Sequence, residues 1–163
     1  MAIEIRIARA DDTALILSFI RELAEYEKLA HEVVTDEARL RATLFGARPA
    51  AEVLIAELDG VAVGFALFFT NYSTFLGKPG LYLEDLFVRP AARSHGIGRS
   101  LMVKLANICV ERDYGRFEWA VLDWNEPALK FYRTLNALPQ TEWTVHRLTG
   151  DSLATLANPS TTE

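Results

Sequence analysis

Cysteine is almost absent from this sequence, since Cys109 is the only one among 163 residues. A single cysteine excludes a disulfide within the chain. Cys109 lies on the apolar stripe of a predicted helix, where we expect a packed thiol rather than a reactive one. Histidine is also scarce, and His31, His95 and His146 do not fall at the spacing of metal ligands. We therefore predict no zinc site and no other metal site.

Long apolar runs are missing as well. No stretch reaches the ~18 residues from which a membrane-spanning helix is inferred. The N-terminus lacks the basic and then apolar order of a signal peptide. The formal net charge of −5 argues against a general nucleic-acid surface. These absences favour a cytoplasmic protein that binds neither membranes nor nucleic acids.

What the chain does have is the composition of one globular domain. Half of its residues are apolar and 24% are charged, which is ordinary for such a domain, and 163 residues suffice for a substantial core. We find no internal repeat, no low-complexity tract and no dividing linker. We expect one domain over residues 1–157 and a loose tail over residues 158–163.

Hydrophobic periodicity predicts alternating strands and helices. Apolar residues alternate over residues 3–7, and spacings of three and four indicate a helix that Asp11 or Asp12 caps and that reaches about Leu29. Asp59-Gly60 predicts a hairpin turn. Further expected strands cover residues 53–58, 61–70, 81–88, 117–122 and 143–148, and residues 71–80 are expected to form a loop. Further helices are expected to begin near residues 37, 97, 126 and 151. The helix that begins near residue 97 should end near Asp113, with Gly115 as its C-terminal stop. These elements predict an α/β fold with a mixed central sheet flanked by helices.

The stretch over residues 81–109 has the strongest chemical signal. A predicted strand ends in Leu86, Phe87 and Val88, and a glycine loop leads from it into a helix. Free backbone N–H groups and the helix dipole attract anions to the start of a helix, and glycines let the backbone approach a ligand closely. Positive charges come from Arg89, Arg93, Arg99 and Lys104, with no acid among them. The expected ligand is a phosphate or a pyrophosphate.

The spacing of this loop excludes two common phosphate motifs. A Walker loop has lysine after its last glycine, whereas Arg99 follows Gly98 here. A dinucleotide fingerprint has a third small residue at the position of Leu101. The order Arg-x-x-Gly-x-Gly, which begins at Arg93, instead resembles the pyrophosphate loop of the GCN5-related N-acetyltransferases (GNAT), which bind acetyl-CoA. The alternative is an ordinary glycine-rich turn between a strand and a helix.

Three further segments sharpen this resemblance. RELAEYEKL at residues 21–29, YLEDLFV at residues 82–88 and AVLDWN at residues 120–125 resemble the diamine (spermidine/spermine) and thialysine N-acetyltransferases. The resemblance covers nearly the whole chain to about Trp143 and weakens after Asn136. It implies a GNAT-type fold and a homodimeric enzyme that transfers acetyl from acetyl-CoA to a primary amine by direct attack.

The resemblance also implies roles for individual residues. The amine is expected near Tyr26, Glu27 and Glu84. Catalytic roles fall to Glu84 and to Tyr132, the latter as the acid that protonates the leaving thiolate. The implied contacts to acetyl-CoA come from Leu86, Phe87, Val88, Arg93, Ser94, His95, Gly96, Ile97, Gly98 and Arg99, and from Asn125, Glu126, Pro127 and Ala128.

The acidic residues have a chemical interpretation of their own. Residues 22–37 contain six acids and one lysine, which suits a cationic substrate but is also typical of a solvated face. Glu27 continues an apolar stripe, and its alternative is a helix end that frays into solvent. Adjacent strand residues face opposite sides, so we expect Glu84 and Asp85 to serve different purposes, with a structural partner for Asp85.

Proton transfer from an amine limits the mechanism. An amine with a pKa of ~10.4 does not readily give its proton to a carboxylate with a pKa of ~4.3, so we expect Glu84 to act through water, or a dry pocket to lower the pKa of the amine. A strand N–H near Phe87 or Val88 is expected to polarise the thioester carbonyl.

Three functions remain open from the sequence. The first is acetyl transfer to a small cationic amine, either a polyamine or a lysine-like amino acid. The second is acetyl transfer to an unrelated amine, such as an antibiotic or a protein N-terminus. The third is a non-catalytic sensor that binds acyl-CoA, against which the presence of both Glu84 and Tyr132 argues.

Overall fold

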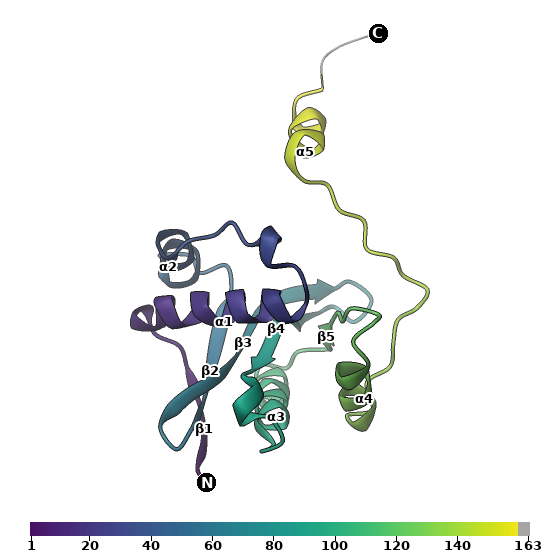
Figure 1. Cartoon of the computed structure of the whole chain (residues 1–163). Coiled ribbons are helices and arrows are strands. Elements are labelled where there is room, and N and C mark those ends of the chain that lie inside the picture. The colour runs from purple at the N-terminus through teal and green to yellow at the C-terminus, as the bar shows by residue number, and fades with distance from the viewer. Residues whose placement is uncertain (160–163) are drawn as a thin grey trace. The chain divides into compact units, whose positions relative to one another are not determined.

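A computed structural model describes residues 1–159 of the chain. These residues fall into two compact units, Met1–Leu122 and residues 123–159 (Figure 1). The part of the expected tail at residues 160–163 lies outside the described residues. Within the described part, no helix is both long enough and apolar enough to cross a membrane.

The first unit is built on a five-stranded mixed sheet in the order β1-β2-β3-β4-β5. The first four strands pair antiparallel, and β5 pairs parallel to β4, which confirms the predicted mixed sheet. The strands are β1 (Ile3–Ile7), β2 (Glu52–Leu58), β3 (Val61–Ser73), β4 (Lys78–Val88) and β5 (Phe117–Trp119).

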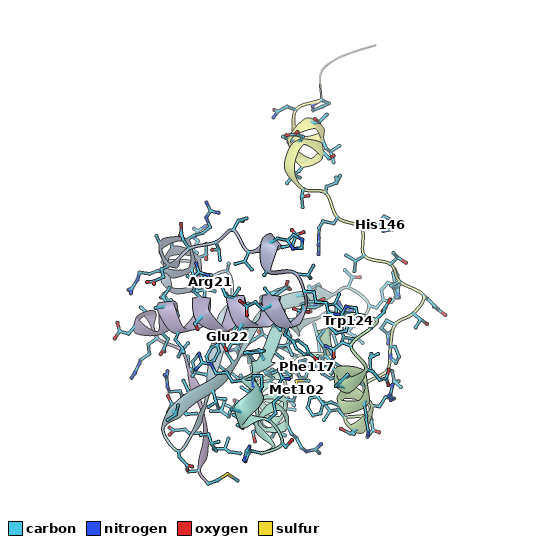
Figure 2. The ribbon with its side chains drawn as sticks, in the orientation of Figure 1. Arg21, Glu22, Met102, Phe117, Trp124 and His146 are labelled. Atoms are coloured by element: carbon cyan, nitrogen blue, oxygen red, sulfur yellow. The ribbon has the colours of Figure 1, made fainter. Side chains whose placement is uncertain are left out.

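Helices cover both faces of this sheet (Figure 1). Helices α1 (Thr13–Tyr26) and α2 (Glu37–Phe45) pack on the face that carries Phe65 and Phe87, where Phe19 stacks on Phe65. Helix α3 (Ile97–Glu111) covers the opposite face of the sheet. That face also has side chains to pack against, because successive side chains of a strand point to opposite faces. Figure 2 shows Met102 on the buried side of α3. The second unit contains α4 (Glu126–Thr134) and α5 (Gly150–Ala157).

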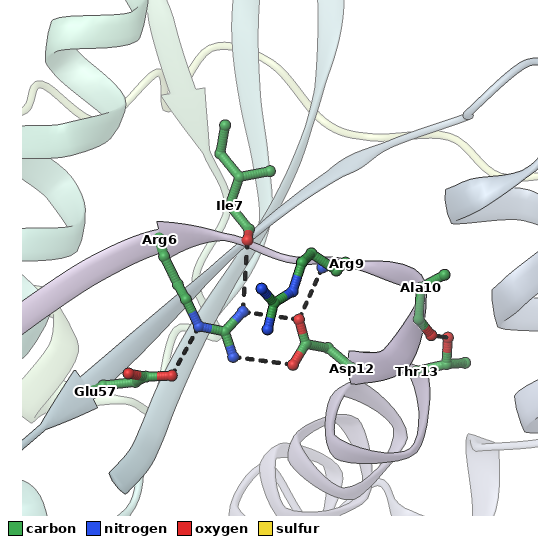
Figure 3. A network of polar contacts seen from close by, with 7 residues as sticks. All are labelled: Arg6, Ile7, Arg9, Ala10, Asp12, Thr13 and Glu57. Carbon is green, nitrogen blue, oxygen red and sulfur yellow. Dashed lines mark hydrogen bonds and ion pairs between the residues drawn. The ribbon is translucent and has the colours of Figure 1, made fainter. Parts of the chain in front are cut away.

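A polar network anchors the start of α1 (Figure 3). The Arg6 guanidinium donates to both Asp12 carboxylate oxygens at 2.8 and 2.9 Å and to Glu57 Oε1 at 2.7 Å. Asp12 also accepts from the backbone N–H of Arg9. The Arg6 hydrogen bond holds the pKa of Asp12 below its usual value despite burial. The Asp12 side chain therefore ties α1 to β1 and β2 rather than capping the helix as we expected.

The two hairpins show what glycine contributes. Asp59 and Gly60 have φ of 50° and 80°, so both are left-handed and the predicted β2–β3 turn is confirmed. The β3–β4 hairpin is longer than predicted, because the expected loop over residues 71–80 is mostly paired strand. At Gly80 a Cβ atom would lie 2.5 Å from Asn71 Oδ1, so the absence of a side chain allows the strands to approach.

Other element ends differ from the prediction. Helix α1 stops at Tyr26 because Lys28 adopts a left-handed φ of 61°, and Asp113 ends α3 in the same way before Gly115. Strand β5 has three residues rather than six. The predicted strand at residues 143–148 is wrong, since this stretch has no regular structure and Trp143 is 81% exposed. Alternation alone does not make a strand without a neighbour to pair with.

Candidate active site

A β-bulge interrupts β4 at Glu84. Leu67 of β3 pairs with Asp85, whereas the next residue, Phe68, pairs with Leu83, so Glu84 has no opposite residue. A bulge bends a strand and re-aims its side chains. The strict alternation by which we separated Glu84 from Asp85 is therefore broken at this point.

Three carboxyl groups interact around this bulge. Burial, and to a smaller extent the negative charges of Glu84 and Glu27, together raise the pKa of Asp85 to about 7. Glu27 is the residue that ends α1, and burial raises its pKa as well. Among residues 1–159 no cation forms an ion pair with Asp85, so the expected structural partner is not found. The first unit thus holds a cluster of negative charge that favours a cation.

One edge of β4 is open beside this cluster. β5 pairs only with Leu81–Leu83, so among the described residues β4 has a partner strand on one side only over residues 84–88. The N–H of Arg89 donates to Val63 O of β3 at 2.8 Å. Along a strand, the backbone N–H and C=O groups of successive residues point alternately to its two edges. The N–H and C=O of Phe87 therefore point toward β3, as the N–H of Arg89 does, while those of Leu86 and Val88 point toward the open edge.

This register refines two expectations. We named the N–H of Phe87 or of Val88 as the group that polarises a thioester, and only that of Val88 faces the open edge. The Phe87 side chain is 5% exposed and belongs to the core between α1 and the sheet. An extended ligand that runs along β4 would therefore meet backbone groups without a partner strand at Leu86 and at the N–H of Val88, whereas Val88 O accepts from Arg93 Nε.

The glycine loop ends at the start of α3, where an anion fits. Gly96 has φ of 80° and precedes Ile97, the first residue of the helix. No atom lies within 4 Å of the position that a Gly96 Cβ would occupy. The first N–H groups of a helix lack intrahelical partners. An open pocket at this point is lined by Gly96, Arg99, Ser100, Val103, Lys104 and Asn107.

The four basic residues of this stretch do not share one role. Arg89 donates to Glu22 Oε1 at 2.8 Å and to Oε2 at 3.0 Å, and its guanidinium lies 4.7 Å from the centre of the Phe19 ring. Figure 2 shows Glu22 on α1. Arg89 therefore joins β4 to α1, and the charge of Glu22 is already paired. Only Arg99 and Lys104 line the pocket.

The side chains of two predicted contact residues, Ile97 and His95, are engaged within the protein itself. The Ile97 side chain is 2% exposed, so it packs in the core. His95 lies with Nδ1 3.1 Å from Ala92 O, within the loop itself. Ser94 is exposed and has a left-handed φ of 69°, which turns the chain toward Gly96. This local geometry agrees with a backbone cradle for phosphate.

The second unit holds the remaining predicted residues. Asn125 Oδ1 accepts the N–H of Ala128 at 3.3 Å and caps α4, with Pro127 in the first turn. Glu126 pairs with Arg133 at 2.7 Å. Tyr132 is partly buried two turns into α4, with its ring centre 5.5 Å from that of Phe131. The predicted cap and helix are confirmed, while the catalytic role of Tyr132 stays a prediction.

The single cysteine is poorly suited to covalent catalysis. Cys109 is buried at 8% exposure, and burial raises the pKa of its thiol, which disfavours the nucleophilic thiolate. Within residues 1–159 no three His, Cys, Asp or Glu side chains gather closely enough to hold a metal ion.

The acetyltransferase (GNAT) family matches residues 18–137. This match spans most of the chain, so the chain belongs to the GNAT family and is an N-acetyltransferase. Members of this family use acetyl-CoA as a co-substrate.

Relatives of known name agree with this assignment. The thialysine N-epsilon-acetyltransferase of Sus scrofa is 40% identical over 94% of this chain and 96% of its own length. The L-ornithine N5-acetyltransferase of Arabidopsis thaliana is 34% identical over 91% of this chain and 85% of its own length.

Solved structures show the same fold. An integron cassette protein from the mobile metagenome of V. cholerae superposes with a TM-score of 0.80 at 28% identity, over 97% of this chain and 99% of its own. An aminoglycoside acetyltransferase from an uncultured soil metagenomic sample superposes with a TM-score of 0.75 at 21% identity, over 90% of this chain and 97% of its own, which supports the fold alone.

Proposed function

We propose that this chain transfers acetyl from acetyl-CoA to a primary amine of a small cationic acceptor, a polyamine or a lysine-like amino acid. The observation that carries this proposal is the negative charge of Glu27, Glu84 and Asp85, with which no Lys, Arg or His among residues 1–159 forms an ion pair. An acceptor with a second positive charge would relieve their mutual repulsion on binding. The thialysine and ornithine acetyltransferases among the relatives are named for substrates of this kind.

Acetyl-CoA would be held by backbone and by two cations. In this proposal the start of α3 at Gly96 and Gly98 takes the pyrophosphate, and Arg99 and Lys104 add positive charge beside it. The open edge of β4 takes the extended arm, and the N–H of Val88 polarises the thioester carbonyl. The first turn of α4 at residues 125–128 supplies further contacts.

Removal of a proton from the amine is easier beside Asp85 than we expected for Glu84 alone. A pKa of about 7 for Asp85 differs by ~3 from that of a free amine, a cost of ~5 kcal/mol. An ordinary glutamate differs by ~6, a cost of ~8 kcal/mol. We propose that Asp85 shares the proton-accepting role with Glu84, either directly or through a bound water.

Protonation of the departing thiolate is assigned to Tyr132. Proton transfer from a phenol with a pKa of ~10 to the thiolate of a thiol with a pKa of ~8.5 costs only ~2 kcal/mol. A phenol with an ordinary pKa keeps its proton at neutral pH, and a nearby positive charge or helix end can close the gap. The buried thiol of Cys109 agrees with direct attack by the amine, because no covalent enzyme intermediate is then needed.

The assembly and location of the enzyme also belong to this proposal. We infer one acetyltransferase domain over residues 1–157, a homodimer in solution and a cytoplasmic protein. The exposed apolar side chains of Trp143, Val145 and Leu148 support a further interface in the second unit. Light scattering that gives the mass of a monomer at micromolar concentration would contradict the dimer.

A turnover screen tests the proposed function. The full chain is mixed with acetyl-CoA and with thialysine, lysine, ornithine or spermidine, and the release of free thiol is followed. Neutral and anionic amines of similar length serve as controls. We expect the cationic amines to have the highest kcat/KM. A preference for neutral or anionic amines would contradict the cationic acceptor, and binding of acetyl-CoA without turnover of any amine would favour a sensor.

A further inference from the structure

Arg93 begins the glycine loop, yet its side chain does not line the pocket at the start of α3. Its Nε donates to Val88 O at 2.9 Å, and its guanidinium carbon lies 5.0 Å from the centre of the Tyr26 ring and 5.8 Å from that of Phe87. One side chain thus contacts the loop, the end of β4 and the last residue of α1.

Each of these contacts lies at a position that the reaction would use. Val88 O is on the open edge of β4, beside the N–H of the same residue. Tyr26 is followed directly by Glu27, whose charge acts on Asp85. A planar guanidinium can stack on a ring and donate in its own plane at the same time, whereas a lysine ammonium makes only a point contact.

We propose that Arg93 is a positioning residue for the acceptor site rather than a phosphate ligand. It fixes Tyr26 and Glu27 relative to the edge of β4 along which the acetyl group would lie. Arg99, six residues further on, lines the pocket and supplies the phosphate contact instead. This inference rests on the proposed function, because it takes Tyr26 and Glu27 as neighbours of the amine.

The charge-preserving variant Arg93→Lys tests this role. We expect the KM of the amine to rise about five-fold, equivalent to about 1 kcal/mol, because the stack on Tyr26 is lost. The Kd of acetyl-CoA, measured by calorimetry, should change less than two-fold. The matched control Arg99→Lys should show the opposite split, with weaker acetyl-CoA binding and an unchanged amine KM. A general loss of stability would not separate the two constants in this way.

A double-mutant cycle asks whether Arg93 acts through the ring. Tyr26→Leu removes the surface on which the guanidinium lies. If Arg93 acts through Tyr26, the double variant should be little worse than Tyr26→Leu alone. Additive effects on the amine KM would overturn the proposal.

Two other results would also overturn it. One is a rise in the Kd of acetyl-CoA for Arg93→Lys as large as that for Arg99→Lys, which would make Arg93 a phosphate ligand. The other is an unchanged amine KM in a folded Arg93→Lys protein. If the lysine variant does not fold, the same two constants are measured for Arg93→Gln instead. The assay uses the best amine from the turnover screen, whatever its charge, so a neutral acceptor would contradict the proposed function without deciding the role of Arg93.

Discussion

The anion site at the start of α3 and the acidic cluster at the β4 bulge are built in different ways. The anion site comes from one contiguous stretch, in which Ser94, Gly96 and the first turn of α3 are neighbours in the chain. The acidic cluster joins Glu27, at the end of α1, to Glu84 and Asp85, more than fifty residues away. The first site uses free backbone groups, whereas the second uses carboxyl side chains whose negative charges repel one another.

This difference shows why charge counts in the sequence mislead. Arg89 and Arg93 stand in the basic stretch, but neither serves the pocket, because one pairs with Glu22 and the other stacks on Tyr26. Glu22 stands in the acidic stretch, but its charge is neutralised by Arg89. Only the fold decides which charges remain available to a ligand.

The largest expected effect concerns Tyr132, which belongs to the second unit. Tyr132→Phe removes only the hydroxyl and keeps the ring against Phe131. If the phenol protonates the leaving thiolate, kcat should fall about 10²-fold while the KM of acetyl-CoA changes little. Single-turnover kinetics should be used so that chemistry limits the rate. Near-normal turnover would leave Tyr132 as a packing residue.

The second prediction measures the repulsion in the acidic cluster. The folded state raises the pKa of Asp85 from 3.8 to about 7, so the native protein binds more protons than the unfolded chain between these values, and its stability falls as pH rises through this window. Asp85→Asn should therefore be more stable than the wild type at pH 8, by about 2 kcal/mol after allowance for partial exposure, with a smaller difference near pH 4. Urea unfolding at both pH values measures this.

A matched control belongs to the same measurement. Asp11 is exposed, and Asp11→Asn should leave the free energy of unfolding nearly unchanged at both pH values. An Asp85→Asn protein with the same difference from the wild type at pH 4 and pH 8 would show that the folded state does not raise the pKa of this carboxyl, either by burial or by the charges of Glu84 and Glu27.

The third prediction tests the anion site. Gly98→Glu places a carboxylate in the first turn of α3, where it repels a phosphate. The Kd of acetyl-CoA should rise more than ten-fold by calorimetry. Gly98→Ala adds a methyl group without charge and serves as the control. If both variants bind as the wild type does, the phosphate lies elsewhere.

The smallest expected effect concerns Glu27. Glu27→Gln removes one negative charge from the cluster and should raise the KM of a cationic amine roughly five-fold, about 1 kcal/mol, with that of acetyl-CoA unchanged. Glu25→Gln changes a neighbouring exposed acid and should affect neither constant. A similar rise for both variants would indicate general attraction by the surface rather than a specific contact.

Much of the fold was predictable because its signals are local. The β2–β3 turn at Asp59-Gly60, the capping of α4 by Asn125 and the entry into α3 through Gly96 follow from backbone preferences of single residues. The predicted strand at residues 143–148 failed because its alternation has no neighbouring strand to pair with among the described residues. The β3–β4 hairpin is longer than predicted because Gly80 pairs with Asn71 across the two strands, where the glycine allows a close approach that loop-type residues do not reveal in the sequence.

The sequence by itself determined the family and predicted an anion site, because a strand, a glycine loop and a helix start are consecutive in the chain. Tertiary structure decided the rest. The bulge at Glu84 arises from how β3 pairs with β4, and it cancels the alternation from which we separated Glu84 and Asp85. The pKa of Asp85 depends on burial and on charges from distant parts of the chain. Such values follow from distances in space, which no spacing along the chain specifies.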